Sequence, residues 1–324
     1  MKTDIIKNYL NKILTFYLPN KAGYWNTITP CNVSSKPKEL SRYYLDFSSK
    51  VNYPGKFSDN GIPLFFYAGK ADIQHPTVIA QYAFGLFEKL FISKFSNKEL
   101  KNKFLIQAEW FYKNQVDVKG GKGWYISIDY HFEYRLTNPW ISAMAQGEAI
   151  SVLTRAFLLT KDERYEKLAI DAIGPFEYEV QEGGLVNYFK SIPVYEECPT
   201  PHKPMAVLNG LFFSLFGLYD LFMLNKNSRA EILFNNGVKS LIKLLPYFDI
   251  KHWTNYYLFD YPKNYYSSYT YHILVTEQLK AIYFITGENT FLEYSERWEN
   301  YSKNYLNKTR ALFAKLIHSN KFSI

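Results

Sequence analysis

Cysteine is scarce in this chain of 324 residues, which has only Cys31 and Cys198, far apart in the sequence. Two distant cysteines do not make the disulfide framework that holds many secreted domains together, so we expect free thiols and a reducing compartment. The six histidines show no metal-ligand spacing, and neither do the cysteines. The sequence therefore predicts no metal site and no bound cofactor.

Long apolar runs are also lacking. The longest candidate, residues 211–224, contains Asp220 and is shorter than the roughly 20 apolar residues that a membrane-spanning helix requires. In residues 1–20 the apolar stretches are broken by three lysines, which predicts a short amphipathic helix instead of a signal peptide. We expect a soluble, cytoplasmic protein with no membrane span.

Signatures of several common chemistries are missing as well. No nucleophile elbow occurs, and the glycine-rich residues 120–123 precede Trp124 instead of the Ser or Thr of a phosphate loop, which predicts a hairpin turn. The formal charge of +8 favours an anionic partner, and its sign alone does not choose among acidic polysaccharide, nucleic acid and membrane surface. Because the lysines are scattered and no nucleic-acid module is recognisable, we do not expect nucleic acid.

Hydrophobic residues are abundant, at 47%, with 21% charged residues, so the chain can bury a sizeable core. Aromatic residues are unusually frequent, with 29 Tyr, 26 Phe and 6 Trp. Most are expected to fill the core, although such rings also form the stacking platforms of sugar sites.

A repeat organises the chain after an irregular beginning. Residues 34–69 are rich in Ser, Pro, Gly and Tyr without helical periodicity, so we divide the chain into a helix and arm, 1–70, and a main domain, 71–324. In the main domain a unit recurs, consisting of a helix, a polar turn, a second helix and an aromatic extended stretch. The first helices are predicted to begin near Pro76, Pro139, Pro204 and Tyr271.

The four first helices each carry a side-chain amide at a comparable place, recurring every 63 to 69 residues: Gln81, Gln146, Asn209 and Gln278. For Gln146 and Gln278 we favour hydrogen bonds from helix to helix around a ring. Cap residues predict second helices after 96–97, 160–162, 227–228 and 286–288. Extended segments are predicted at 124–135, 183–195 and 253–261.

Helical hairpins with a common period bury their apolar stripes against their neighbours. We therefore predict an all-α fold, an incomplete (α/α) toroid or barrel of about four helical hairpins, with short β-hairpins at one mouth. Because the hairpins join outer helices to the next inner helices, the functional site is expected at that mouth.

Several blocks of the sequence resemble the catalytic helical domain of the D-glucuronyl C5-epimerase family, from residue 72 to residue 301. They are IAQY at 79–82, PWISAMAQG at 139–147, YEE at 195–197, VLNG at 207–210, SLFGLYD at 214–220 and YH at 271–272. Members convert glucuronate to iduronate in heparan-like glycosaminoglycan chains. The resemblance implies an isomerase that acts on an acidic polysaccharide without a metal ion.

The resemblance also implies roles for residues in the matched blocks. Acid–base catalysis falls to Glu197, Tyr256 and Tyr271, with Tyr257 as an alternative to Tyr256, and Asn209 is implied to bind sugar. The remaining candidates for substrate binding are Gln81, Tyr82, Tyr195, His272 and Lys203. Two acid–base groups suit the chemistry, because inversion at C5 removes a proton alpha to a carboxylate and returns one to the opposite face.

The chain departs from the family pattern at two positions and in one domain. Cys198 replaces a tyrosine beside the catalytic Glu, and Phe259 replaces an arginine that would hold a carboxylate. The missing cation could come from Lys203, His272, His202 or Lys263. We also expect no counterpart of the β-rich N-terminal domain of the animal enzymes, so that either part of the polysaccharide cleft is missing or a second subunit supplies it in a homodimer.

Two alternatives stay open. A uronate lyase or glycosidase on the same toroid would share removal of the C5 proton as its first step. A non-catalytic carbohydrate-binding protein would account for the changes at Cys198 and Phe259.

Overall fold

The computed structural model describes residues 10, 13–18, 23–131 and 135–319. Helices follow one another in pairs, and we call the first of each pair inner and the second outer. The inner helices are α2 (Pro76–Ile92), α4 (Ala143–Thr160), α6 (Leu208–Asn225) and α8 (Tyr269–Thr286). The outer helices are α3 (Lys98–Lys113), α5 (Glu163–Asp171), α7 (Ser228–Phe248) and α9 (Asn289–Lys303), and α10 (Tyr305–Ser319) follows them.

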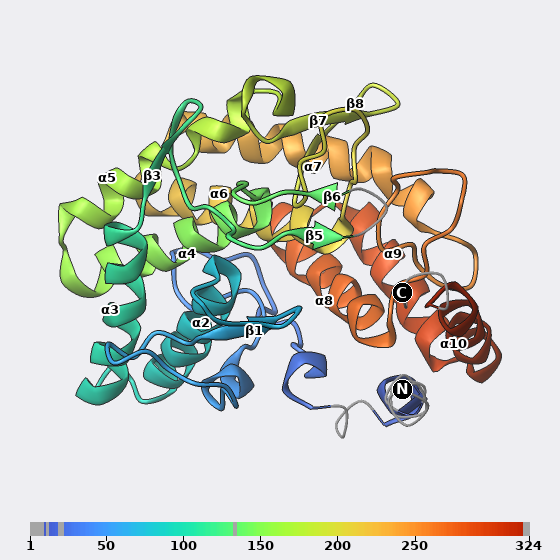
Figure 1. Ribbon diagram of the computed structural model, residues 1–324, viewed down its shortest axis with the longest axis horizontal. Coiled ribbons are helices and arrows are strands. Elements are labelled where there is room, and N and C mark those ends of the chain that lie inside the picture. The colour runs from blue at the N-terminus through green and yellow to red at the C-terminus, as the bar shows by residue number, and fades with distance from the viewer. Residues whose placement is uncertain (1–9, 11–12, 19–22, 132–134, 320–324) are drawn as a thin grey trace.

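The inner helices pack side by side in chain order, α2 on α4, α4 on α6 and α6 on α8. Each outer helix packs on the inner helix before it, so the pairs form a curved array (Figure 1). The predicted incomplete (α/α) toroid of about four helical hairpins is therefore confirmed. Of the predicted N-terminal helix, residues 13–17 are helical, and residues 1–9, 11–12 and 19–20 lie outside the described part.

The helices begin where local capping chemistry allows. Asn97, Asp162 and Asn227 cap α3, α5 and α7 by accepting hydrogen bonds from first-turn N–H groups, as predicted. The inner helix α2 begins at Pro76, but the starts predicted at Pro139 and Pro204 are wrong by four residues each. At the first of these, Trp140 still pairs with Ile126 in an extended bridge, so the helix begins only after this pairing ends.

Short antiparallel hairpins connect or precede the helices. They are β1 (Phe65–Tyr67) with β2 (Lys70–Ile73), β3 (Val116–Val118) with β4 (Gly121–Gly123), β5 (Tyr130–His131) with β6 (Arg135–Leu136), and β7 (Val186–Phe189) with β8 (Ile192–Tyr195). A hairpin is present where the turn was predicted at 120–123, but its turn lies at residues 119–120, and Gly121–Gly123 form β4. The third predicted extended segment, 253–261, makes only isolated bridges among the described residues, such as Asn255 with Tyr266.

Two glycines let α4 and α6 approach until their backbones touch. A Cβ atom on Gly147 would lie 2.4 Å from the carbonyl oxygen of Phe213, and one on Gly217 would lie 2.2 Å from that of Gly147. Both distances are far below van der Waals contact, so only glycine fits at either position.

The arm before α2 fills the space between α2 and α8, at the two ends of the array (Figure 1). The backbone N–H of Cys31 donates to a carboxylate oxygen of Glu277 in α8 at 2.8 Å. The Asn32 amide donates to Glu88 in α2 at 2.9 Å. Farther along the arm, Tyr44 is buried in the same core as the inner helices. The arm therefore completes the ring wall that the helices leave open.

The predicted helix-to-helix amide contacts are half right. Gln278 in α8 donates to the backbone oxygen of Asn209 in α6 at 3.2 Å, so this prediction is confirmed. Gln146 instead donates to the backbone oxygens of Lys122, at 2.6 Å, and Ala172, at 2.8 Å. It ties α4 to the β3–β4 hairpin and to the end of α5, because the neighbouring face of α4 is occupied by the glycine contact with α6.

A buried ion pair joins α4, α6 and the arm. Arg155 Nη1 lies 2.5 Å from Asp220 Oδ2, and both side chains are 0% exposed. The Tyr44 hydroxyl donates to Asp220 Oδ1 at 2.6 Å. The Arg155 guanidinium also donates to the backbone oxygens of Ser41 and Arg42 at 3.1 and 3.2 Å. Each charge thus has several partners from more than one element.

Asp220 lies in a helix whose composition would also suit a membrane. α6 has a mean hydropathy of 1.2 over its 18 residues, and among the described helices it alone is long and apolar enough to cross a bilayer. However, 78% of it is buried inside the molecule. Its apolar character is therefore that of a central core helix, packed between α4 and α8.

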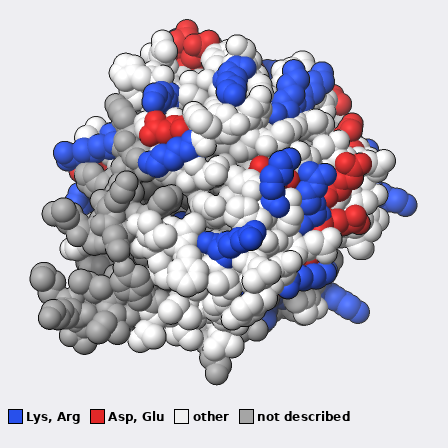
Figure 2. Space-filling view, turned by 90° about the vertical axis from the view of Figure 1, so that its right-hand side faces the viewer, with Lys and Arg blue, Asp and Glu red and all other residues white. Residues whose placement is uncertain are grey.

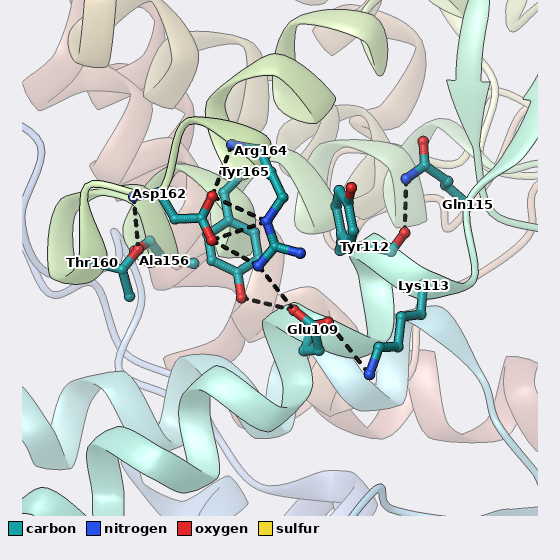
Figure 3. A network of polar contacts seen from close by, with 9 residues as sticks. All are labelled: Glu109, Tyr112, Lys113, Gln115, Ala156, Thr160, Asp162, Arg164 and Tyr165. Carbon is teal, nitrogen blue, oxygen red and sulfur yellow. Dashed lines mark hydrogen bonds and ion pairs between the residues drawn. The ribbon is translucent and has the colours of Figure 1, made fainter.

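Polar networks and scattered charges cover the outside. Figure 3 shows the junction of α3 and α5, where the Tyr165 hydroxyl donates to Glu109 at 3.1 Å and Arg164 lies 3.8 Å from the same carboxylate. On the face shown in Figure 2, Lys and Arg are spread among Asp and Glu instead of forming one basic patch. Such exposed pairs contribute little to stability individually.

We predict that Arg155→Met destabilises the protein by about 3–5 kcal/mol, because it leaves the Asp220 carboxylate buried without its cation. The measurement is urea unfolding followed by circular dichroism. The double variant Arg155→Met/Asp220→Leu removes both charges and should recover part of the loss. A loss below about 1 kcal/mol in the single variant would contradict this account of the ion pair.

Candidate active site

A cavity of about 240 Å³ opens at the N-terminal ends of the inner helices. Every inner helix contributes to its wall, together with the arm and the segments around β1 and β5. The helical contributions are Thr77, Val78 and Gln81 from α2, Met144 from α4, Asn209 and Phe213 from α6, and Thr270, Tyr271 and Leu274 from α8. Of the three extended segments expected at this mouth, 124–135 lines the cavity through Ile126, Ile128 and Tyr130, the second is followed by the lining residues Glu197 and Cys198, and 253–261 does not line it.

Helix N-termini make such a cavity attractive to anions. The first-turn N–H groups of a helix have no partner within the helix, and the helix dipole adds partial positive charge there. The first turns of α2 and α6 have no side-chain cap, whereas Ser142 and Ser268 cap α4 and α8. The fold therefore favours a negatively charged ligand at this mouth.

Glu197 lies in this wall, two residues after β8. Gly210 of α6 makes room for it, since a Cβ atom there would lie 2.3 Å from Glu197 Oε2. The Asn209 amide donates to the same oxygen at 3.3 Å. Burial raises the pKa of Glu197 to about 7, while the Asn209 hydrogen bond partly opposes the shift. A carboxyl group with this pKa can accept and return a proton near neutral pH.

Tyr271 faces the same cavity from the first turn of α8. Burial of the phenol, followed by the charge of Glu197, raises its pKa to about 12, and hydrogen bonding with Tyr256 partly opposes this. The residue as a whole is 39% exposed, because part of the ring borders the open mouth. Tyr271 is therefore a neutral phenol at neutral pH and can donate a proton.

Tyr256 stands behind Tyr271, with ring centroids 4.7 Å apart. Burial raises its pKa well above the usual range, and the charges of Tyr271 and Glu197 contribute further. Its neighbour Tyr257 packs against Tyr265 at 4.3 Å. Of the two alternatives from the sequence, Tyr256 is thus the one in contact with Tyr271.

Tyr256 does not itself line the cavity, but Tyr130 does, together with Tyr67, and Tyr130 was not predicted. Tyr130 lies in β5, and its pKa is raised well above the usual range by burial first, then by the charges of Cys198, Tyr271 and Glu197. The only signal in the sequence was its place in an aromatic extended segment expected at the mouth. No motif distinguished it from the other tyrosines.

Two amide side chains, Asn209 and Gln81, add polar groups to the wall. Asn209 is 2% exposed, and its Oδ1 accepts no hydrogen bond from the described residues, so this oxygen is available to a ligand. Gln81 donates to Glu148 Oε1 at 3.1 Å. Glu148 was not predicted; it orients Gln81, and burial raises the pKa of its carboxyl group well above the usual range.

Four residues predicted to bind substrate lie outside the cavity wall. Tyr82 packs on Phe57, and the Tyr195 hydroxyl donates to the backbone oxygen of Leu233. His272 is 0% exposed and stacks on Trp253 at 3.8 Å. The fourth, Lys203, pairs with Asp260 at 2.9 Å. Their side chains have protein partners instead of a place in the site.

The two departures from the family pattern differ in their setting. Cys198 lines the cavity beside Glu197, and burial raises its pKa well above the usual range, so it is a neutral thiol. Phe259 lies away from the cavity, with the Lys203 ammonium 5.3 Å from its ring.

None of the proposed replacement cations reaches the wall. Burial lowers the pKa of His272 to about 3, so it is neutral, and His202, Lys203 and Lys263 do not line the cavity. Among the lysines and arginines that the structure describes, Lys50 of the arm is the one in the wall. No group of three or more His, Cys, Asp and Glu residues that could hold a metal ion occurs in the described part of the chain.

Comparisons with known proteins show the family to which this chain belongs. Residues 119–300 match the family described as D-glucuronyl C5-epimerase C-terminus. A D-glucuronyl C5-epimerase of Caenorhabditis elegans is 37% identical over 218 residues, which are 61% of this chain and 35% of that protein. An uncharacterised protein of Methanocaldococcus jannaschii is 29% identical over 176 residues, 52% of this chain and 56% of that one. The chain thus spans about a third to a half of the length of these relatives.

Among solved structures, the cellobiose 2-epimerase of Bacillus thermoamylovorans has the same fold. The TM-score is 0.53 at 12% sequence identity, covering 94% of this chain and 88% of that chain. At this identity the likeness shows the toroid alone. The match over residues 119–300, which includes Glu197, Asn209, Tyr256 and Tyr271, places this chain in the D-glucuronyl C5-epimerase family.

Proposed function

We propose that the protein is a C5-epimerase that inverts C5 of hexuronate residues, glucuronate to iduronate, within an acidic polysaccharide. The observation that carries the proposal is that Glu197 and Tyr271 line the same cavity. Burial raises the pKa of both groups, and the charge of Glu197 raises the pKa of Tyr271 further. Family membership supports the same reaction. The anion-favouring helix N-termini are consistent with a uronate substrate.

The geometry suggests how the proton would move. The Glu197 carboxylate accepts the C5 proton, and the electron pair of the broken C–H bond moves toward the uronate carboxylate, giving an enediolate-like species. The Tyr271 phenol donates its proton to the opposite face of C5, and Tyr256 stabilises the resulting phenolate by hydrogen bonding. Return of the proton from Glu197 to Tyr271 resets the site. In the reverse direction the two groups exchange roles.

Two amide side chains, Asn209 and Gln81, orient the sugar by hydrogen bonding. Asn209 donates to Glu197 through Nδ2 and offers a vacant Oδ1, so it can fix the base and accept a hydrogen bond from a sugar hydroxyl. Gln81, held by its hydrogen bond to Glu148, lines the same wall. Aromatic rings such as Tyr67 and Tyr130, stacked at 5.9 Å, offer apolar faces to the sugar ring.

The direct test is isotope exchange. Incubation with a glucuronate polymer in deuterated water should place deuterium at C5 with chain length unchanged, as read by NMR and size-exclusion chromatography. An unsaturated, ultraviolet-absorbing product or shortened chains would point instead to a lyase or glycosidase. Binding without exchange on any uronate polymer would indicate a non-catalytic carbohydrate-binding protein.

We predict that the exchange rate falls as pH drops through about 7. Glu197 accepts a proton only when ionised, and because its pKa is raised to about 7, the ionised form is present above that pH and lost below it. Tyr271, with a pKa of about 12, stays neutral over this range. Glu197→Gln should lower the rate about 10²–10⁴-fold, and the exposed Glu296→Gln is the control. A flat profile from pH 5 to 9 would exclude Glu197 as the base.

Tyr271→Phe should also lower exchange by about 10²–10⁴-fold, because it removes the proton donor and leaves the ring in place. The matched control is Tyr269→Phe in the same helical turn, whose ring packs on Phe16 and Trp253. It should change the rate by less than about twofold. Full exchange activity in Tyr271→Phe would assign the acid role to another phenol, Tyr130 or Tyr256.

A further inference from the structure

Lys50 is a buried cation on the arm side of the cavity. It belongs to the 3₁₀ turn Ser48–Val51, which packs against α2, and it is 5% exposed. Its ammonium donates to the backbone oxygen of Tyr24 at 2.9 Å and lies 4.4 Å from the centre of the Tyr24 ring. Lys50 lines the cavity wall together with Trp25 and Thr29.

No carboxylate of the described residues lies within ion-pair distance of this ammonium, whereas the buried carboxylates of Asp220 and Glu88 are paired with Arg155 and Arg42. An ammonium group has three donors, and the contact to Tyr24 uses one. Burial alone lowers the pKa of Lys50 to about 8, so it remains largely charged at neutral pH. A charge that is buried at a cavity wall without a counterion is suited to an anionic ligand.

A second feature of the same wall also favours an anion. α2 begins here, and no side chain caps the N–H groups of its first turn. His75, which precedes the helix, lines the cavity, and its buried Nδ1 has no hydrogen-bond partner among the described residues. The partial positive charge of a helix N-terminus therefore adds to that of Lys50.

Lys50 and Glu197 are held by different elements of the cavity wall. The Lys50 ammonium donates to the backbone oxygen of Tyr24 in the arm, whereas Glu197 accepts a hydrogen bond from Asn209 in α6. We therefore assign Lys50 to a part of the cavity other than the one around the reacting carbon. The carboxylate of a uronate is attached directly to C5, so a base at C5 lies close to it.

We propose that Lys50 and the N-terminus of α2 form a subsite for the acidic group, carboxylate or sulfate, of the sugar next to the reacting hexuronate. The exposed ring of Trp25 beside Lys50 offers that sugar a stacking surface. The proposal rests on the proposed epimerase function. It makes Lys50 a residue that selects polymers by the charge of the neighbouring sugar.

The test compares three polymers whose hexuronate is flanked by a neutral sugar, a sulfated sugar or a second uronate. In the wild type, KM for exchange should be lower for the polymers with a sulfated or uronate neighbour than for the polymer with a neutral neighbour. The acidic polymer with the lower KM identifies whether the subsite takes sulfate or carboxylate. Lys50→Met should raise KM for the acidic neighbours by about 10- to 100-fold. It should leave kcat and the KM for the neutral neighbour unchanged, and Lys50→Arg should restore part of the preference.

Controls separate the subsite from folding and from the reaction itself. Lys119→Met removes an exposed lysine that lies 4.7 Å over the Tyr178 ring, a contact like that of Lys50, and should change nothing. Thermal unfolding checks that the Lys50 variants are folded. Equal loss on all three polymers, or no loss on any, would overturn the subsite.

If the wild type exchanges no polymer, the epimerase proposal fails first, and calorimetric binding of the same three oligosaccharides still tests the subsite. Lys50→Met should then weaken binding of only the two acidic-neighbour oligosaccharides. Unchanged affinity for them would refute the subsite on its own.

Discussion

The buried ion pair of Arg155 with Asp220 is the interaction on which the rest of the structure depends. Removing two charges from water is costly, and the cost is offset only if each charge is surrounded by partners. Those partners come from α4, α6 and the arm, including the Tyr44 hydroxyl and the Ser41 and Arg42 carbonyls. The two central helices and the arm are therefore coupled, and none of them satisfies the pair alone.

This coupling extends to the cavity. The arm that helps to satisfy Arg155 also carries Lys50 and Trp25, while α4 and α6 present Met144 and Asn209 at their N-terminal ends. Burial raises the pKa of Glu197 and lowers the pKa of Lys50. Both shifts have the same cause, because surroundings of low dielectric constant disfavour the charged carboxylate and the charged ammonium alike. An anionic substrate changes this balance, because it favours the charged form of the lysine and disfavours that of the acid.

The sequence predicted what local chemistry determines. Caps such as Asn97 and Asp162 located the outer helices, and the matched blocks placed Glu197, Asn209 and Tyr271 in one wall. It failed where the direction of a side chain matters. Successive helical residues point about 100° apart, so Gln81 and Tyr271 face the cavity whereas their neighbours Tyr82 and His272 face the core.

The unpredicted residues of the site depend on long-range packing. Lys50 lies in an arm without periodicity, and only its docking against α2 brings it to the wall. Glu148 sits among the apolar residues of α4, where its partner Gln81 comes from another inner helix. Likewise, α4 does not begin at Pro139, because Trp140 pairs with Ile126 in an extended bridge. This long-range pairing outweighs the tendency of proline to occupy the first turn of a helix.

The glycine contact between α4 and α6 has a consequence for how such a toroid diversifies. With Gly147 and Gly217 in backbone contact, the two central helices cannot slide past each other or spread without losing dense packing. The two central helices are thus a fixed frame, whereas the hairpins around them take no part in this contact and can vary more readily in length and sequence. In such a fold, new ligand preferences would arise by rebuilding the hairpins while this frame stays as it is.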